Sequence, residues 1–212
     1  GHLYSADCHS SPVYQLIRGA YYPSFGKPHD GLGFAPVMCE HTHGSTGICG
    51  IVYLDGGVWG PDWDDQVFVG NVVTSRVNRD QVAFTGSTPK AQERPDFLVS
   101  EDPWFRPVDL QLGPDHALYV ADFYNRIIGH YEVPLDHPGR DRHRGRIWRV
   151  VKKDVPRPVS SDFTRLSPKQ IAEELGSPNL TRRNFALSEV RRRGDVTWLA
   201  ELGRIFADDT PF

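Results

Sequence analysis

The sequence is poor in cysteine, has no long apolar run and carries no strong charge of either sign. Its three cysteines form neither a CxxC pair nor the CxxCH motif that attaches haem. No apolar stretch approaches the ~20 residues that cross a bilayer. Lysine and arginine number 24 against 27 aspartates and glutamates, a net charge of -3. We therefore expect no nucleic acid and no anionic membrane surface as a partner.

The cysteines are Cys8, Cys39 and Cys49. An odd number cannot all pair within one chain. We interpret them as buried free thiols, because free cysteine is among the most buried residue types. A disulfide between Cys8 and Cys39, formed in an oxidising compartment, is the alternative.

Length and composition predict a globular protein. The 212 residues are 39% hydrophobic, which suffices for a packed core in one large domain or two small ones. The chain begins at Gly1, without a methionine or a signal peptide. We therefore expect either a processed protein or a piece of a longer one.

One short pattern occurs three times, an alternating apolar stretch that ends in Asp or Asn. The copies are Leu3–Asp7, Val67–Asn71 and Leu118–Asp122. A strand-and-turn unit repeated every roughly 50 to 60 residues is typical of β-propeller blades. The expected fold is mainly β, a partial β-propeller of about three blades of antiparallel four-stranded sheet. Because a propeller has about 4 to 8 blades, we expect an internal fragment or pairing with another copy.

We expect a partial first blade and two complete ones. The expected strands are residues 3–7 and 12–18, then 47–54, 66–71, 75–85 and 95–100, then 107–112, 117–121, 126–132 and 146–151. Turn residues predict chain reversals at 55–57, 78–80, 86–87 and 113–115. Residues 21–36, rich in Gly, Pro and aromatics, predict a long ordered loop.

After the sheets, the period of the apolar residues changes from two to about 3.6. Ser167 is a good N-cap, with Pro168 at the first helical position and Gly176 at the C′ position. Short helices with one apolar stripe each predict the start of a HEAT-like repeat. The expected domains are residues 1–152 for the later propeller blades, 153–163 for a linker and 164–212 for the helices.

Two further helices are expected in this segment. One spans residues 179–193, buries Phe185, Ala186 and Val190, and ends at Gly194. The other carries its apolar side chains at residues 199, 202, 205 and 206.

Candidate functional residues follow from the geometry of a blade. The loop before the first strand and the loop after the second strand open on the same face, so their residues gather at the mouth of the axial channel. The loops before first strands hold residues 41–44 and 104–106, and those after second strands hold residues 7–9, 71 and 122–125. We interpret Asp122 and Asn125 as structural, because such side chains satisfy backbone groups in tight turns.

The histidines at the mouth have more than one interpretation. His41 and His43 point the same way on an extended segment, a spacing usable for a metal with Asp7 or His9 as third ligand. We assign no metal, because two histidines without a defined third ligand more often hydrogen-bond to neighbouring loops. His9, next to Asp7, is either a general base oriented by a carboxylate or part of a polar turn.

Arg106 precedes the first strand of the third blade. A permanent positive charge at the channel mouth suits a carboxylate or an anionic cofactor. The basic run from residue 137 to residue 144 suggests an anion site, but its alternating charges favour a solvated surface turn.

Four stretches of the sequence carry a family resemblance: residues 105–115 (FRPVDLQLGPD), 117–132 (ALYVADFYNRIIGHYE), 21–34 and 136–148. With them the chain resembles the planctomycete-type membrane-bound dehydrogenase proteins over nearly its whole length. The propeller of that family is similar to soluble glucose and sorbosone dehydrogenases. HEAT-like helices and usually a C-terminal haem-binding CxxCH domain follow it.

The resemblance implies a quinoprotein-like dehydrogenase that oxidises a sugar or another alcohol. Its cofactor would be pyrroloquinoline quinone, and its electrons would pass to a cytochrome-type haem in a downstream domain. The protein would be periplasmic or exported, with any attachment to the membrane made by segments outside this chain.

The resemblance also assigns roles to residues. Arg106 matches an arginine beside the quinone in the glucose dehydrogenase relatives, whereas their lysine one blade earlier has no counterpart near residues 71–76. The blade with their catalytic histidine is expected upstream of Gly1. The candidate catalytic residues here are His9 and His43, and the candidate cofactor-binding residues are Arg106, His41 and Asn71.

Two hypotheses remain open from the sequence. An enzyme module predicts that Arg106, His9 and His43 converge on one cavity. A non-catalytic scaffold that binds carbohydrate or protein predicts a shallow aromatic rim, formed by Tyr21, Tyr22, Trp59, Trp63 and Trp104.

Overall fold

The structure is a computed structural model that describes residues 2–8, 13–23, 34–44, 47–129, 131–159, 161–194 and 196–207. The chain forms two compact units. The first comprises residues 1–54, 65–111 and 118–150, and the second comprises residues 55–64, 112–117 and 151–212. The second unit therefore takes two loops from the middle of the chain as well as its C-terminal part.

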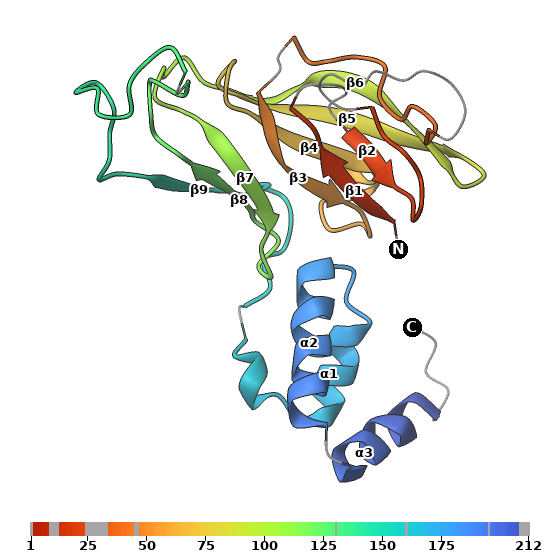
Figure 1. Cartoon of the computed structure of the whole chain (residues 1–212). Coiled ribbons are helices and arrows are strands. Elements are labelled where there is room, and N and C mark those ends of the chain that lie inside the picture. Colours follow the sequence, from red (N-terminus) through yellow and green to blue (C-terminus); the bar gives the residue numbers. More distant parts are fainter. Residues whose placement is uncertain are drawn as a thin grey trace. The chain divides into compact units, whose positions relative to one another are not determined.

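The described part of the first unit contains three antiparallel sheets (Figure 1). The strands are β1 (Leu3–Ala6) and β2 (Val13–Leu16), then β3 (Ile48–Leu54), β4 (Gln66–Asn71), β5 (Arg76–Thr85) and β6 (Thr88–Val99), then β7 (Pro107–Leu112), β8 (Leu118–Asp122) and β9 (Arg146–Val150). Within each sheet, strands that are neighbours in sequence are neighbours in space. Each sheet is therefore a simple meander, as the repeated pattern predicts.

The four-stranded sheet differs from the prediction at its third and fourth strands. The fourth strand, β6, begins at Thr88 and not at the predicted residue 95. The predicted turn at residues 78–80 is wrong, because these residues lie inside β5 and pair with β4 and β6. Asn78 and Asp80 are buried there, and polar residues in mid-strand resemble a turn when only composition is read. The reversal predicted at residues 86–87 is confirmed as the tip of the β5–β6 hairpin, where Thr85 pairs with Thr88.

The third sheet has three strands in the described residues, not four. Described residues between 126 and 132 form no strand. The carbonyl oxygen of Arg126 accepts from Arg106, and those of Ile127 and Gly129 accept from Arg140. Side chains thus satisfy this backbone in place of a neighbouring strand.

The core of the first unit joins the first two sheets. It consists of buried aliphatic side chains from β2, β3, β4 and β5 and from the segment before β3: Val13, Met38, Ile48, Val67, Val69 and Val82. Tyr4 of β1 stacks on Tyr53 of β3, with ring centroids 5.3 Å apart. Consecutive sheets are therefore packed against each other.

Two glycines let the second and third sheets approach each other. Gly50 of β3 has φ +63°, and a Cβ there would lie 2.5 Å from the Cα of Asp109 on β7. At Gly70 of β4, a Cβ would overlap the carbonyl oxygens of Pro107 and Cys49. Only glycine leaves room for this contact.

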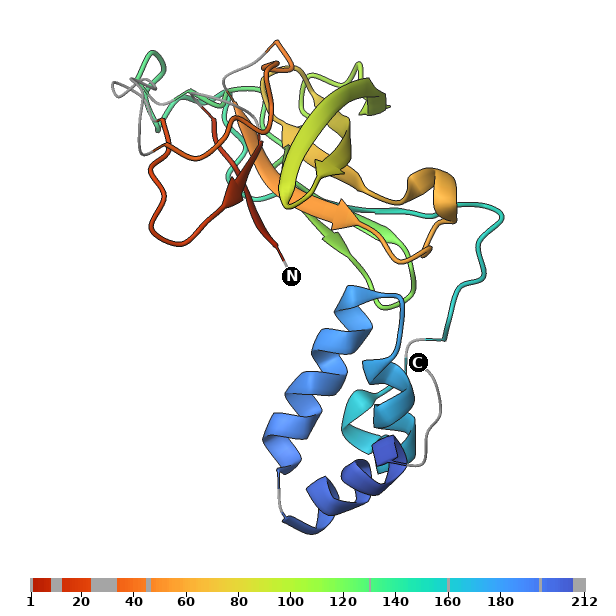
Figure 2. The same ribbon diagram turned by 90° about the vertical axis from the view of Figure 1, so that its right-hand side faces the viewer.

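The second unit contains three α-helices in the part of the chain that the structure describes: α1 (Pro168–Leu175), α2 (Leu180–Arg193) and α3 (Val196–Ala207). Figure 2 shows α1 and α2 side by side and α3 lying across their end. Two 3₁₀ turns, η1 (Pro61–Trp63) and η2 (Phe163–Arg165), also belong to this unit. None of the described helices is long and apolar enough to cross a membrane.

The predicted cap of α1 is confirmed. The Ser167 side chain accepts from the backbone N–H of Gln170, and the Gln170 side chain accepts from the N–H of Ser167. Gly176, expected at the C′ position, is instead the C-cap residue, with right-handed backbone at φ -86°. Ala186 is buried as predicted, whereas Phe185 is 44% exposed.

Asn179 anchors α2 within the second unit. Its side-chain oxygen accepts from the N–H groups of Thr181 and Arg182, and its Nδ2 donates to the carbonyl of Gly113 at 2.9 Å. Arg182 also donates to the carbonyl of Pro114. The loop between β7 and β8 is thereby fixed to the start of α2.

We predict that Gly70→Ala destabilises the protein by about 2 kcal/mol, because the new methyl group overlaps the backbone of Pro107. Chemical denaturation measures the change. The control is Gly203→Ala in α3, where a Cβ meets nothing within 4 Å and alanine is the better helix former. Equal stability of Gly70→Ala and the unmodified protein would contradict the close packing of the two sheets.

We predict that Asn179→Ala costs about 2 kcal/mol, about half from the lost helix cap and half from the lost buried hydrogen bond to Gly113. Asn179→Ser keeps an oxygen that can cap the helix and loses the Nδ2 donor, so it should cost less than alanine. Thermal unfolding followed by the helical circular dichroism signal measures both. Equal losses for the two variants would mean that the cap contributes nothing.

Candidate functional site

The centre of the candidate site is a strand residue, Asp80, whose side chain is fully buried. Its partners come from residues 38–43, a segment that precedes β3 and lies along β6. This segment is held in place by the N–H of Ala91, which donates to the carbonyl of Met38 at 2.8 Å. An ion pair of Lys90 with Glu40 adds to it at the surface.

Two histidine rings share the carboxylate of Asp80. His41 Nε2 lies 2.6 Å from Oδ1, and His43 Nε2 lies 2.9 Å from Oδ2. The two rings meet edge to face, with centroids 4.6 Å apart. A buried carboxylate needs such partners, because burial without them is costly.

His43 is the more enclosed histidine. Its ring is fully buried, and its Nδ1 lies 3.1 Å from Oε1 of Glu93, whose side chain is 54% exposed. Burial lowers the pKa of His43, but the hydrogen bond and charge of Asp80, joined by Glu93, outweigh it and raise the pKa above its ordinary value. The backbone of His43 is left-handed, at φ 51°, an uncommon conformation for a residue other than glycine.

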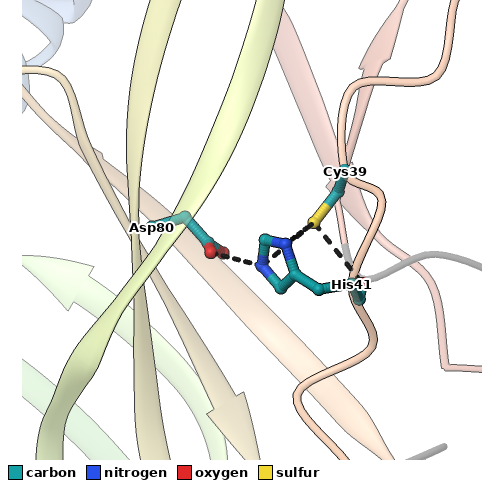
Figure 3. A group of neighbouring side chains, drawn as sticks. All are labelled: Cys39, His41 and Asp80. Atoms are coloured by element: carbon teal, nitrogen blue, oxygen red, sulfur yellow. Dashed lines mark hydrogen bonds and ion pairs between the residues drawn. The ribbon is translucent and has the colours of Figure 1, made fainter.

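Cys39 lies on the other side of His41 (Figure 3). Its Sγ is 3.3 Å from Nε2 and 3.5 Å from Nδ1 of the ring. Burial, followed by the negative charge of Asp80, raises the pKa of this thiol to about 12. The three cysteines are free thiols; Cys39 is buried as predicted, whereas Cys8 and Cys49 are only partly buried.

Asn71 connects the histidine segment to the loop after β4. Its Nδ2 donates to the carbonyl of His43 at 3.5 Å and to Oδ1 of Asn78 at 3.0 Å. Its Oδ1 accepts from the N–H of Thr74 at 3.1 Å. Asn71 is fully buried, and these hydrogen bonds of its side chain are all made within the protein.

Arg106 lies between the loops that follow β4 and β8. Its guanidinium donates to the carbonyls of Val72, Asn125 and Arg126 and to the hydroxyl of Ser75, at distances from 2.8 to 3.1 Å. These contacts bind the two loops together. Its assignment to a cofactor stays a prediction.

Asp122 is a second buried carboxylate with several partners. Its Oδ1 accepts from the N–H groups of Arg106 and Tyr124, and its Oδ2 accepts from Arg146 Nε and Trp148 Nε1. Asn125 accepts from the N–H of Ile127. The structural interpretation of Asp122 and Asn125 is confirmed.

The basic run near residue 140 lines a cavity of about 510 Å³ in the first unit. Arg126, Arg140 and Arg144 contribute to its wall. Arg140 donates to four backbone carbonyls, and Arg144 pairs with Asp141. These two arginines therefore hold the loop together.

The structure thus brings four of the five candidate residues into one connected region. His41 and His43 meet at Asp80, His43 contacts Asn71, and the residue after Asn71 contacts Arg106. The fifth candidate, His9, lies outside the described residues. The sequence prediction missed Asp80, Glu93 and Cys39, because the first two lie on strands β5 and β6 where only the fold brings them to the histidines.

Fold and site together define a mainly β protein with C-terminal helices and a buried cluster of histidines and carboxylates. Residues 8–154 match the family model described as "Domain of unknown function (DUF7133)". The chain belongs to that family. No curated protein and no solved structure matches it.

We predict that Asp122→Ala destabilises the protein by about 3 kcal/mol or more. The substitution leaves the buried N–H of Arg106 and the partly buried donors of Tyr124 and Trp148 without their acceptor. It also removes the ion-pair partner of Arg146. Urea denaturation measures the change. Asp136→Ala, at an exposed loop position, serves as the control and should stay within about 0.5 kcal/mol. Similar midpoints for the two variants would show that Asp122 is not a structural centre.

Proposed function

We propose that the chain is the later part of a β-propeller in a dehydrogenase that oxidises a sugar or another alcohol. The observation that carries this proposal is the convergence of His41, His43, Asn71 and Arg106 into one connected region. These residues come from separate segments of the sequence. The enzyme hypothesis required Arg106, His9 and His43 to converge on one cavity; Arg106 and His43 lie in this connected region, and His9 lies outside the described residues. An enzyme site needs such a set of convergent polar groups.

The propeller is supported by the arrangement of the sheets. Each sheet is a meander, as a propeller blade is. The first sheet packs on the second through Tyr4 and Tyr53, and the second meets the third at Gly50 and Gly70. Sheets that follow each other in sequence and contact each other in space are what a radial arrangement requires.

The histidine cluster is the proposed place for the reacting hydroxyl group of the substrate. His41 is 21% exposed at its side chain and Glu93 is 54% exposed, so both reach solvent at the edge of the cluster. Asp80 and His43 are enclosed and fix the orientation of the exposed members. Such buried support is what holds a site in one geometry.

The described residues do not fit the quinone that the resemblance implies. Pyrroloquinoline quinone is an anionic cofactor, and the arginine matched to its site is Arg106. Four of the five N–H donors of that guanidinium already make hydrogen bonds to backbone carbonyls and to the Ser75 hydroxyl. We therefore assign no step to a quinone. Electron transfer to a cytochrome and export from the cytoplasm belong to the same proposal, on the resemblance alone.

The test uses the protein that carries this chain, purified at its native length. It is assayed for reduction of an artificial electron-accepting dye with hexoses, pentoses and primary alcohols, with and without added pyrroloquinoline quinone. We expect dye reduction with at least one substrate class. His43→Asn should lower the rate about 100-fold or more, because a misplaced substrate costs that much, while Asp136→Ala should leave it unchanged.

Absence of dye reduction under all these conditions would refute the dehydrogenase. A non-catalytic scaffold that binds carbohydrate or protein is then the second candidate. It is favoured by the use of Arg106 to join two loops. Of the aromatic residues expected at its rim, Trp59 is only 3% exposed and donates to the carbonyl of His116, whereas Tyr21 is 71% exposed. Calorimetric titration with sugars separates binding without turnover from no binding.

A further inference from the structure

We infer that Cys39, His41 and Asp80 form a binding site for a divalent transition-metal ion with the ligand preference of zinc. The three side chains come from a segment before β3 and from the middle of β5 (Figure 3). One ligand atom from each lies within 4.8 Å of the other two. This places a sulfur, an imidazole nitrogen and a carboxylate oxygen around one point.

The spacing of the donor atoms is close to that of a zinc site. With Zn–S and Zn–N bonds of about 2.3 and 2.0 Å, tetrahedral ligands lie about 3.5 Å apart. Sγ of Cys39 is 3.3 Å from His41 Nε2. His41 Nε2 and Asp80 Oδ1 are 2.6 Å apart, so these two atoms must separate by a few tenths of an ångström or more. A rotation of the partly exposed His41 ring supplies that movement.

The donor types select the class of metal. Calcium and magnesium take oxygen ligands, whereas thiolate and imidazole select zinc and its neighbours among the transition metals. Three protein ligands leave a fourth position for water, as in zinc sites that bind a substrate. The side chain of His41 is 21% exposed, which gives solvent access to the ion.

The ligands are held by partners outside the donor set. His43 Nε2 donates to Oδ2, the oxygen of Asp80 that is not used for the ion, and His43 Nδ1 lies against Glu93. The N–H of Ala91 fixes the backbone next to Cys39. Such outer contacts orient metal ligands and support affinity. The proposed ion also accounts for the burial of a thiol and a carboxylate within 4.8 Å of each other.

Both the protons released on metal binding and the charge of the ion can be accounted for. The ion forms a bond to the Cys39 sulfur, the S–H bond breaks, and the proton passes to water. The ion also takes the place of the proton that His41 Nε2 donates to Asp80; that proton leaves Nε2 for water, and the neutral imidazole carries its remaining proton on Nδ1. The thiolate and the Asp80 carboxylate then neutralise the two charges of the ion. The like charges that would otherwise repel each other in the buried site are thereby compensated.

A second set of donors, His41, His43 and Glu93, lies beside the first. Glu93 is half exposed and His43 already bonds through both nitrogens. Cys39 and Asp80 are both buried, so the first set is the more enclosed one. In the proposed dehydrogenase, the ion would hold the substrate hydroxyl. The metal site itself does not depend on that reaction.

The experiment is a titration of the whole protein with zinc and with cobalt after removal of metals by a chelator. We expect one ion per chain and, with cobalt, the near-ultraviolet charge-transfer band of a cobalt–thiolate bond. Cys39→Ser should abolish the band and weaken zinc binding at least tenfold. Cys49→Ser, which changes a cysteine outside the cluster, is the matched control and should keep both.

Each outcome decides the proposal. No bound zinc and no cobalt spectrum in the unmodified protein would overturn it, as would a band that persists in Cys39→Ser. Loss of binding in Glu93→Gln together with unchanged binding in Cys39→Ser would assign the ion to the second set instead. Circular dichroism confirms that each variant is folded, and Asp80→Asn tests the oxygen ligand. Because metal binding is measured without substrate, its result can be interpreted even if the dehydrogenase assay fails.

Discussion

The buried carboxylate of Asp80 is the constraint on which the candidate site depends. A charge placed in the middle of a sheet must find partners, and here they are the two imidazoles of His41 and His43. The contacts of these imidazoles with Asp80 hold the segment before β3 against β5 and β6. Cys39 is brought to the same place as a consequence, and Glu93 already lies there because it pairs with Asp80 in the register of β5 and β6.

Asp122 has the same role in the third sheet. It ends β8 and binds the backbone of Arg106 and Tyr124 and the side chains of Arg146 and Trp148. Both carboxylates fasten irregular loops to regular strands. The difference lies in the partners: Asp122 is held by N–H donors of the backbone, of arginine and of tryptophan, whereas the cluster around Asp80 contains imidazole and thiol groups, which can bind a metal ion.

This difference connects the two proposals. The cluster around Asp80 combines sulfur, nitrogen and oxygen donors that lie within 4.8 Å of one another. Arg106, the residue that the family resemblance assigned to a quinone, is instead committed to holding two loops. Both proposals therefore rest on the groups around the histidines.

The sequence by itself determined the strands that repeat the alternating pattern, the β5–β6 reversal at Gly86, the capped start of α1 and the pair of histidines. These are local features, set by residue periodicity, turn chemistry and spacing along the chain. It could not determine that residues 78–80 lie in a strand or that Asp80 contacts the two histidines. Nor could it determine that the described residues between 126 and 132 form no strand. Those outcomes depend on which distant groups satisfy a buried charge or carbonyl, and only the packing of the sheets decides which groups are near enough to do so.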